Sequence, residues 1–102
     1  MAKTRFSHPG GILKREFLDE LGLSVSAAAT AMKMSRARLN EIVRGDRSVT
    51  ADSALRLARF FGTTPEFWMN LQSHYDLSLA ASAQRALLRG IDPLDRASHA
   101  TA

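Results

Sequence analysis

The chain has no cysteine and no apolar run long enough to cross a membrane. Without cysteine it can form neither disulfides nor thiolate-bound metal centres, which is consistent with a reducing compartment. A membrane span needs about 18 or more apolar residues, and the first ten residues, MAKTRFSHPG, lack the apolar segment of a signal peptide. These absences predict a cytoplasmic protein that does not enter a membrane.

The motifs that carry enzyme chemistry are also missing. The sequence contains neither a glycine-rich phosphate loop nor the H-E-x-x-H pair of zinc proteases. Its three histidines, His8, His74 and His99, lie in separate regions without metal-ligand spacing. They suit helix capping, interface packing and a tail position, respectively. We therefore expect no catalytic residue, no metal and no cofactor.

What the chain does have is the composition of one small globular unit with a basic surface. It has 102 residues, of which 45% are hydrophobic and 24% charged, with a formal net charge of +4. A basic protein favours an anionic partner, although a solvated basic surface is the alternative. Five basic residues gather in one short stretch: Lys33, Arg36, Arg38, Arg44 and Arg47. This clustering favours nucleic acid as the partner.

The same stretch, residues 24–45, reads as two short helices joined by a tight turn. Ser24 and Ser35 are good N-caps for the two helices. On the second helix, apolar residues including Leu39 and Ile42 share one face, while polar residues share another. The small Ala29 would let the two helices cross closely. The pattern predicts a helix-turn-helix whose second helix has a core face and a reading face.

Flanking residues predict a wholly helical fold. A first helix is expected over residues 9–21 with Leu21 on its buried side, a fourth over 51–61 with Leu55 in the core, and a fifth over 65–80. A short sixth helix can follow as far as Arg89. The expected organisation is a flexible arm (1–8), a DNA-binding and dimerisation domain (9–80) and a C-terminal extension (81–102) that ends disordered.

The fifth helix carries more apolar residues than one stripe can bury. A protein that leaves such residues exposed commonly buries them against another subunit. We therefore predict a homodimer, with this candidate interface: Trp68, Leu71, Tyr75 and Leu79.

Position along the second motif helix suggests a role for each residue that can read DNA. Ser35, at the helix start, can bind a phosphate through its hydroxyl and nearby N–H groups, and Arg36 can reach guanine in the major groove. Ala37 can touch a thymine methyl. Asn40 can pair with adenine or bind phosphate, and Glu41 can accept a hydrogen bond from cytosine.

Three further arginines complete the candidate DNA-binding set. Arg44 and Arg47, at the far end of the helix and in the following loop, are better placed to hold phosphates than to read bases. Arg38 leaves the helix on a different flank, where it either reaches DNA or stays in solvent.

Three segments of the chain together resemble the HigA-type antitoxins, a branch of the phage-repressor-like (XRE) helix-turn-helix family. They are HPGGILKREFLDELGLS, the helix-turn-helix itself, and VTADSALRLARFFGTTPEFWMNLQSHYDLSLA, covering residues 8–80. The resemblance implies a five-helix DNA-binding domain that dimerises through its C-terminal helix. It further implies binding to a palindromic operator, repression of the protein's own operon, and neutralisation of a partner toxin that is an mRNA-cleaving ribonuclease.

Two residues depart from the family pattern. Lys33 occupies the turn position usually held by glycine, which requires a left-handed backbone if the turn is kept. Val25 stands where many relatives place a glutamine that contacts DNA, leaving Ser24 or Ser26 as substitutes. Two other functions stay open: a solitary repressor without a toxin, and a toxin-binding adaptor that has lost DNA binding.

Overall fold

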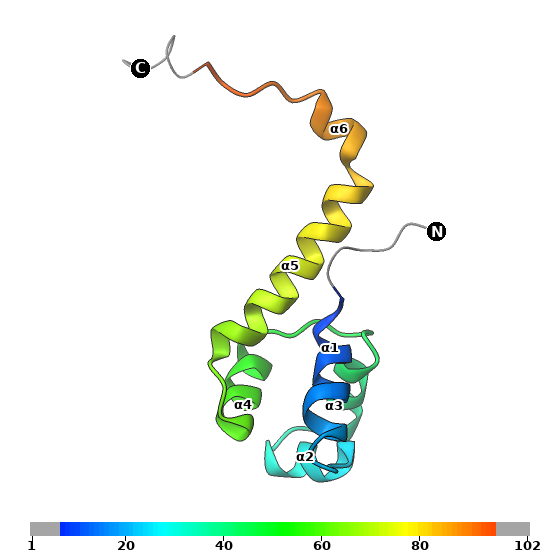
Figure 1. Ribbon diagram of the computed structural model, residues 1–102, viewed down its shortest axis with the longest axis vertical. Helices are drawn as coiled ribbons and strands as arrows, with labels where there is room; N and C mark the ends of the chain where they lie inside the picture. The colour runs from blue at the N-terminus through cyan, green and yellow to red at the C-terminus, as the bar shows by residue number, and fades with distance from the viewer. Residues whose placement is uncertain (1–6, 96–102) are drawn as a thin grey trace.

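The computed structural model describes residues 7–95, and all regular structure in that range is helical (Figure 1). The elements are α1 (Pro9–Ile12), the π-helical segment η1 (Leu13–Asp19), α2 (Val25–Ala31), α3 (Arg36–Val43), α4 (Ala51–Phe61), α5 (Pro65–Ala83) and α6 (Arg85–Arg89). The predicted all-α class is confirmed. Most of the arm and most of the C-terminal tail predicted to be disordered lie outside the described residues.

The helices up to α4 cluster together, and α5 leads away from them (Figure 1). α6 lies at the far end of α5, remote from α2 and α4. No helix among residues 7–95 combines the length and the hydrophobicity that crossing a membrane would require. The arrangement therefore separates a packed helical body from a helical extension.

Side-chain caps explain where the helices begin. The Ser24 Oγ accepts a hydrogen bond from the Ala27 N–H at 3.0 Å, and the Ser35 Oγ accepts one from the Arg38 N–H at 3.1 Å. Thr50 closes a capping box with Ser53 at the start of α4. Each cap satisfies a backbone donor that the helix itself leaves unpaired. The predicted starts of α2, α3 and α4 are confirmed.

The end of the first helix differs from the prediction. α1 runs directly into η1, which ends at Asp19 rather than at residue 21. A π-helical turn contains more residues than an α-helical turn, so the α-helical spacing loses register along η1. Leu21 consequently lies beyond the helix with 61% of its surface exposed. Its assignment to the core was wrong.

Trp68 lies in the centre of the core, not at a subunit interface. Its side chain is 0% exposed, and its indole N–H donates a hydrogen bond to the Thr63 Oγ1 at 2.7 Å. The rings of Phe17 and Phe67 each lie 5.0 Å from its ring, measured between centroids. A side chain surrounded by its own domain has no surface to offer a partner. Trp68 is therefore removed from the predicted dimer interface.

The other predicted interface residues lie farther along α5. Leu71 is partly buried against the core, and Tyr75 is partly buried with its ring against His8. Leu79 is 42% exposed, and its neighbour Leu77 is more exposed still. α5 also extends three residues beyond the predicted end at 80. Exposed leucines thus concentrate on the part of α5 that leaves the helical body.

The turn between α2 and α3 keeps the left-handed geometry despite having no glycine. Lys33 has a φ of 56°, the only positive φ at a non-glycine residue among those described. Its N–H donates to the Thr30 carbonyl at 3.1 Å, and its own carbonyl accepts from the Arg56 guanidinium at 2.7 Å. These bonds hold the residue in a conformation that disfavours a Cβ atom.

Replacing Lys33 with glycine is expected to stabilise the fold by about 1 kcal/mol. Glycine removes the steric cost of the left-handed backbone, which exceeds its own entropic cost on folding. Chemical unfolding of the two proteins measures the difference. A loss of stability in Lys33→Gly would show instead that the lysine side chain makes a stabilising contact.

Candidate nucleic-acid interface

The predicted reading helix, α3, is seated on the start of α1. Gly10 is buried, and a Cβ atom placed on it would lie 2.0 Å from the carbonyl oxygen of Ile42 and 2.7 Å from that of Val43. Only a residue without a side chain lets the two backbones approach this closely. Leu39 and Ile42 anchor the other side of α3 in the core. The helix is thereby fixed with its remaining face outward.

That outward face carries the residues predicted to read DNA. Arg36, Ala37 and Arg44 are exposed, and Asn40 and Glu41 are partly exposed. Ser35 stands at the helix start, where its hydroxyl oxygen accepts the Arg38 N–H while its own proton stays available to a phosphate. The structure thus places these predicted residues on one helix and its cap.

Two of the arginines pair with carboxylates on the protein surface. Arg47 contacts the Glu41 carboxylate at 2.7 Å, and Arg44 contacts Asp46 at 3.3 Å. All four side chains are close to half exposed or more. Exposed ion pairs contribute about 0 to 1 kcal/mol. Exchanging the carboxylate for a DNA phosphate therefore costs these arginines little.

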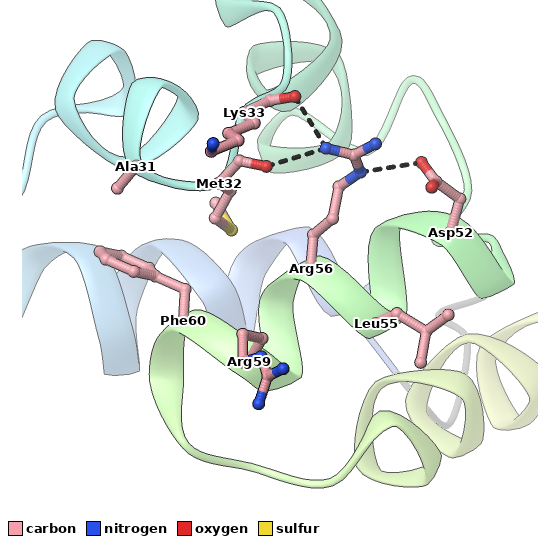
Figure 2. Close-up of a pocket in the computed structure, with 8 residues that line it drawn as sticks. All are labelled: Ala31, Met32, Lys33, Asp52, Leu55, Arg56, Arg59 and Phe60. Carbon is pink, nitrogen blue, oxygen red and sulfur yellow. Dashed lines mark hydrogen bonds and ion pairs between the residues drawn. The ribbon is translucent and has the colours of Figure 1, made fainter.

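Arg38 is held on the flank of α3 by a three-residue network. Its guanidinium contacts the Asp52 carboxylate at 2.6 Å, and the same carboxylate contacts Arg56 at 3.1 Å. Arg56 also donates to the backbone carbonyls of Met32 at 3.0 Å and Lys33 at 2.7 Å (Figure 2). The two guanidinium groups, Arg38 first, lower the pKa of Asp52. The network joins α3 and the end of α2 to α4.

A small basic helical domain with a capped, outward-facing second motif helix matches a known family. The family model for helix-turn-helix proteins covers residues 14–68. The chain belongs to the helix-turn-helix family.

The sequence similarity of this helix-turn-helix protein to its relatives extends beyond the motif. Virulence-associated protein I of Dichelobacter nodosus is 48% identical over 80 residues, which are 78% of this chain and 74% of the relative. Antitoxin HigA-1 of Vibrio cholerae is 41% identical over 68 residues, 67% of this chain and 64% of that antitoxin.

The similarity also holds for the three-dimensional structure. The antitoxin HigA of Pseudomonas aeruginosa, in a structure with the higBA promoter, superposes with a TM-score of 0.84 at 47% identity. The match covers 88% of this chain and 99% of the antitoxin. The resemblance to HigA-type antitoxins is confirmed.

His8 contacts both the start of α1 and α5 of this helix-turn-helix protein. Its Nδ1 accepts a hydrogen bond from the Gly10 N–H at 2.9 Å and so caps α1. Its ring lies edge-on to Tyr75, and the Arg47 backbone, in the loop after α3, acts to raise the pKa of the ring. The predicted capping role is confirmed, whereas the boundary that placed His8 in a flexible arm was wrong.

The stability of the protein should fall in mild acid because of His8. Burial lowers the pKa of its ring below 6.5, outweighing the opposing effects of Arg47, Asp76 and Asp46. The folded state then binds fewer protons than the unfolded state, so the His8 contribution is complete above about pH 6.5 and is lost as the pH falls below it.

Chemical unfolding between about pH 7.5 and 5.5 tests this, with His8→Asn as the comparison. Asparagine keeps a helix cap but does not titrate in this range. The wild-type protein should lose more stability on acidification than the variant. Equal losses would show that protonation of His8 is not coupled to folding.

An open groove of about 490 Å³ lies between α4 and the turn after α2 (Figure 2). Leu55 lines it with 59% of its surface exposed, so the prediction that Leu55 belongs to the core was wrong. α4 already buries Ala54, Leu57 and Ala58, which lie on a different face of the helix. The full lining is Ala31, Met32, Lys33, Asp52, Leu55, Arg56, Arg59 and Phe60.

One important polar residue was missed by the reading of the sequence. Gln72 is buried, and its side-chain oxygen accepts a hydrogen bond from the Val49 N–H at 2.7 Å, while its amide donates to Asp76 at 2.9 Å. It thereby ties the loop after α3 to α5. Its position on an amphipathic helix gave no signal of burial.

Among residues 7–95, no group of three or more side chains could hold a metal ion.

Proposed function

We propose that this protein is a DNA-binding antitoxin that binds the operator of its own operon through α3 and represses transcription. It acts as a homodimer in the cytoplasm and neutralises a partner toxin that cleaves mRNA. The observation that carries the proposal is the outward polar face of α3, set in the most basic stretch of a chain similar to an antitoxin solved with promoter DNA.

On this proposal, α3 divides into a reading part and an anchoring part. Arg36 reads guanine near the helix start, with Ala37 and Asn40 beside it in the groove. Arg44 and Arg47 hold phosphates once they leave their surface carboxylates. Release of Arg47 also frees Glu41 to accept a hydrogen bond from cytosine.

Arg38 requires a different account because its partner Asp52 also binds Arg56. If Arg38 left Asp52, the contact that joins α3 to α4 through this pair would be lost. We therefore assign Arg38 to contacts at the edge of the DNA interface, made without breaking its bond to Asp52.

Dimerisation is supported by the exposed leucines on the second half of α5. Two copies related by a twofold axis would bury Leu79 and Tyr75, with Leu71 at the edge, and would place two α3 helices about 34 to 36 Å apart, one turn of DNA. Sedimentation of wild-type protein should show a dimer, and Leu79→Glu should dissociate it.

Leu21→Glu is the control for the possibility that a glutamate at any exposed leucine would dissociate the dimer. Leu21 is 61% exposed against 42% for Leu79, but it follows η1 and is not part of α5. Leu21→Glu should leave the dimer intact. A monomeric wild-type protein, or dissociation by both substitutions alike, would contradict an interface on α5.

Co-expression with the neighbouring reading frame tests the antitoxin function. If that frame encodes the toxin, its expression alone should arrest growth and cleave mRNA, and co-expression of this protein should prevent both. A transcriptional reporter carrying the DNA upstream of the operon should be repressed in the same cells. Repression without any toxin would support the solitary repressor, and toxin neutralisation without repression would support the adaptor.

A further inference from the structure

The groove between α4 and the turn after α2 combines apolar surface with positive charge. Leu55 and Phe60 are both exposed within it (Figure 2). Lys33, Arg56 and Arg59 contribute three cationic side chains against the single carboxylate of Asp52. The groove therefore suits a segment that has apolar side chains and negative charge.

Two of the charged side chains in the groove already have partners within the protein. Asp52 binds two arginines, and Arg56 is held by backbone carbonyls. Arg59, in contrast, makes no ion pair within the described part of the chain. A carboxylate that enters the groove thus meets a cation with no competing carboxylate among residues 7–95.

The chain contains a segment with the complementary properties. Residues 91–95, IDPLD, follow α6 without forming a helix, and Pro93 keeps the residue before it extended. Ile91 and Leu94 are exposed, and Asp92 has no ion pair to any residue in the range 7–95. The segment is non-helical, acidic and apolar at once.

This segment cannot reach the groove of its own chain. α5 has 19 residues and is about 28 Å long, and it carries α6 to the end of the molecule opposite α2 and α4 (Figure 1). If two α5 helices cross near residues 75–83, the second chain after residue 83 runs back toward the first half of the first α5. α4 packs against that half.

We propose that the groove receives residues 91–95 of a second copy of this chain, with Ile91 and Leu94 on Leu55 and Phe60 and Asp92 on Arg59. The proposal rests on the homodimer proposed above. Each subunit would then hold the end of the other, so that one dimer buries two grooves and two tails.

Because the chain lacks cysteine, pairs of introduced cysteines report this contact directly. One full-length variant carries Ala31→Cys in the groove, and another carries Leu94→Cys in the tail with a mass tag. A disulfide forms only where the two Cβ atoms come within about 4.5 Å. After co-expression and mild oxidation, the crosslink between unlike chains should exceed, by severalfold, that of a control pair with Ser26→Cys, at the other end of α2.

Charge reversal provides the second readout. Arg59→Glu should reduce the yield of the crosslink by up to about fivefold, and Asp92→Lys in the tail-bearing chain should restore it. The proposal is overturned if the crosslink yield equals that of the control pair, or if neither charge reversal changes the yield. Sedimentation distinguishes failure of the docked tail from failure of the dimer. A dimer without the crosslink contradicts only the docked tail, whereas a monomer contradicts the dimer as well.

Discussion

Replacement of Gly10 by alanine is expected to destabilise the protein by about 3 kcal/mol and to weaken DNA binding. The new methyl group would lie 2.0 Å from the Ile42 carbonyl oxygen, well inside contact distance, so α1 and α3 must separate. Both partners are backbone and cannot rotate away. Chemical unfolding measures the stability, and titration with operator DNA under folding conditions measures the effect on α3.

Gly11 offers a matched control in the next position of the same helix. A Cβ atom there would lie 3.1 Å from the flexible end of the Arg15 side chain, which can move aside. Gly11→Ala should therefore be neutral or stabilise by about 0.5 to 1 kcal/mol, because alanine favours a helix. If the two substitutions had equal effects, the close approach of α1 to α3 would not determine the stability of the site.

Arg36→Ala is expected to lower operator affinity by about 1 to 3 kcal/mol for each half-site and to relax the preference at one base pair. Affinity for random DNA should fall much less, because a guanine contact exists only on the correct sequence. Titration of both duplexes with full-length protein measures the two losses.

Arg44→Ala should behave differently because phosphates are present on every sequence. It should weaken binding to operator and random duplex alike, and lower the slope of log affinity against log salt by about one unit for each phosphate that is no longer bound. If the two arginine variants had the same profile on both duplexes, the division of α3 into reading and anchoring parts would be wrong.

Features encoded by neighbouring residues were predictable from the sequence. Ser24, Ser35 and Thr50 cap the helices that follow them, because a cap and its backbone partner lie within three residues of each other. The family pattern required a left-handed Lys33 only if the turn kept its usual geometry, and the φ of 56° shows that it does. Local chemistry therefore located the helix-turn-helix and the outward face of α3.

Features that depend on distant residues were not predictable. The approach of Gly10 to Ile42 joins positions 32 residues apart, and the contact of Arg38 with Asp52 joins different helices. Trp68 was misplaced for the same reason. α5 has apolar residues on more than one face, and only the packing of Phe17 and Thr63 decides which face is buried. The π-helical turn of η1 likewise has no recognised sequence signature.

The most direct test of the central claim is a titration of the wild-type protein with the duplex upstream of its own reading frame and with a scrambled duplex, across a salt series. We predict affinity for the upstream duplex at least about 10³-fold higher, with steep salt dependence on both. Equal affinity for the two sequences, or binding to neither, would contradict the claim that α3 reads an operator.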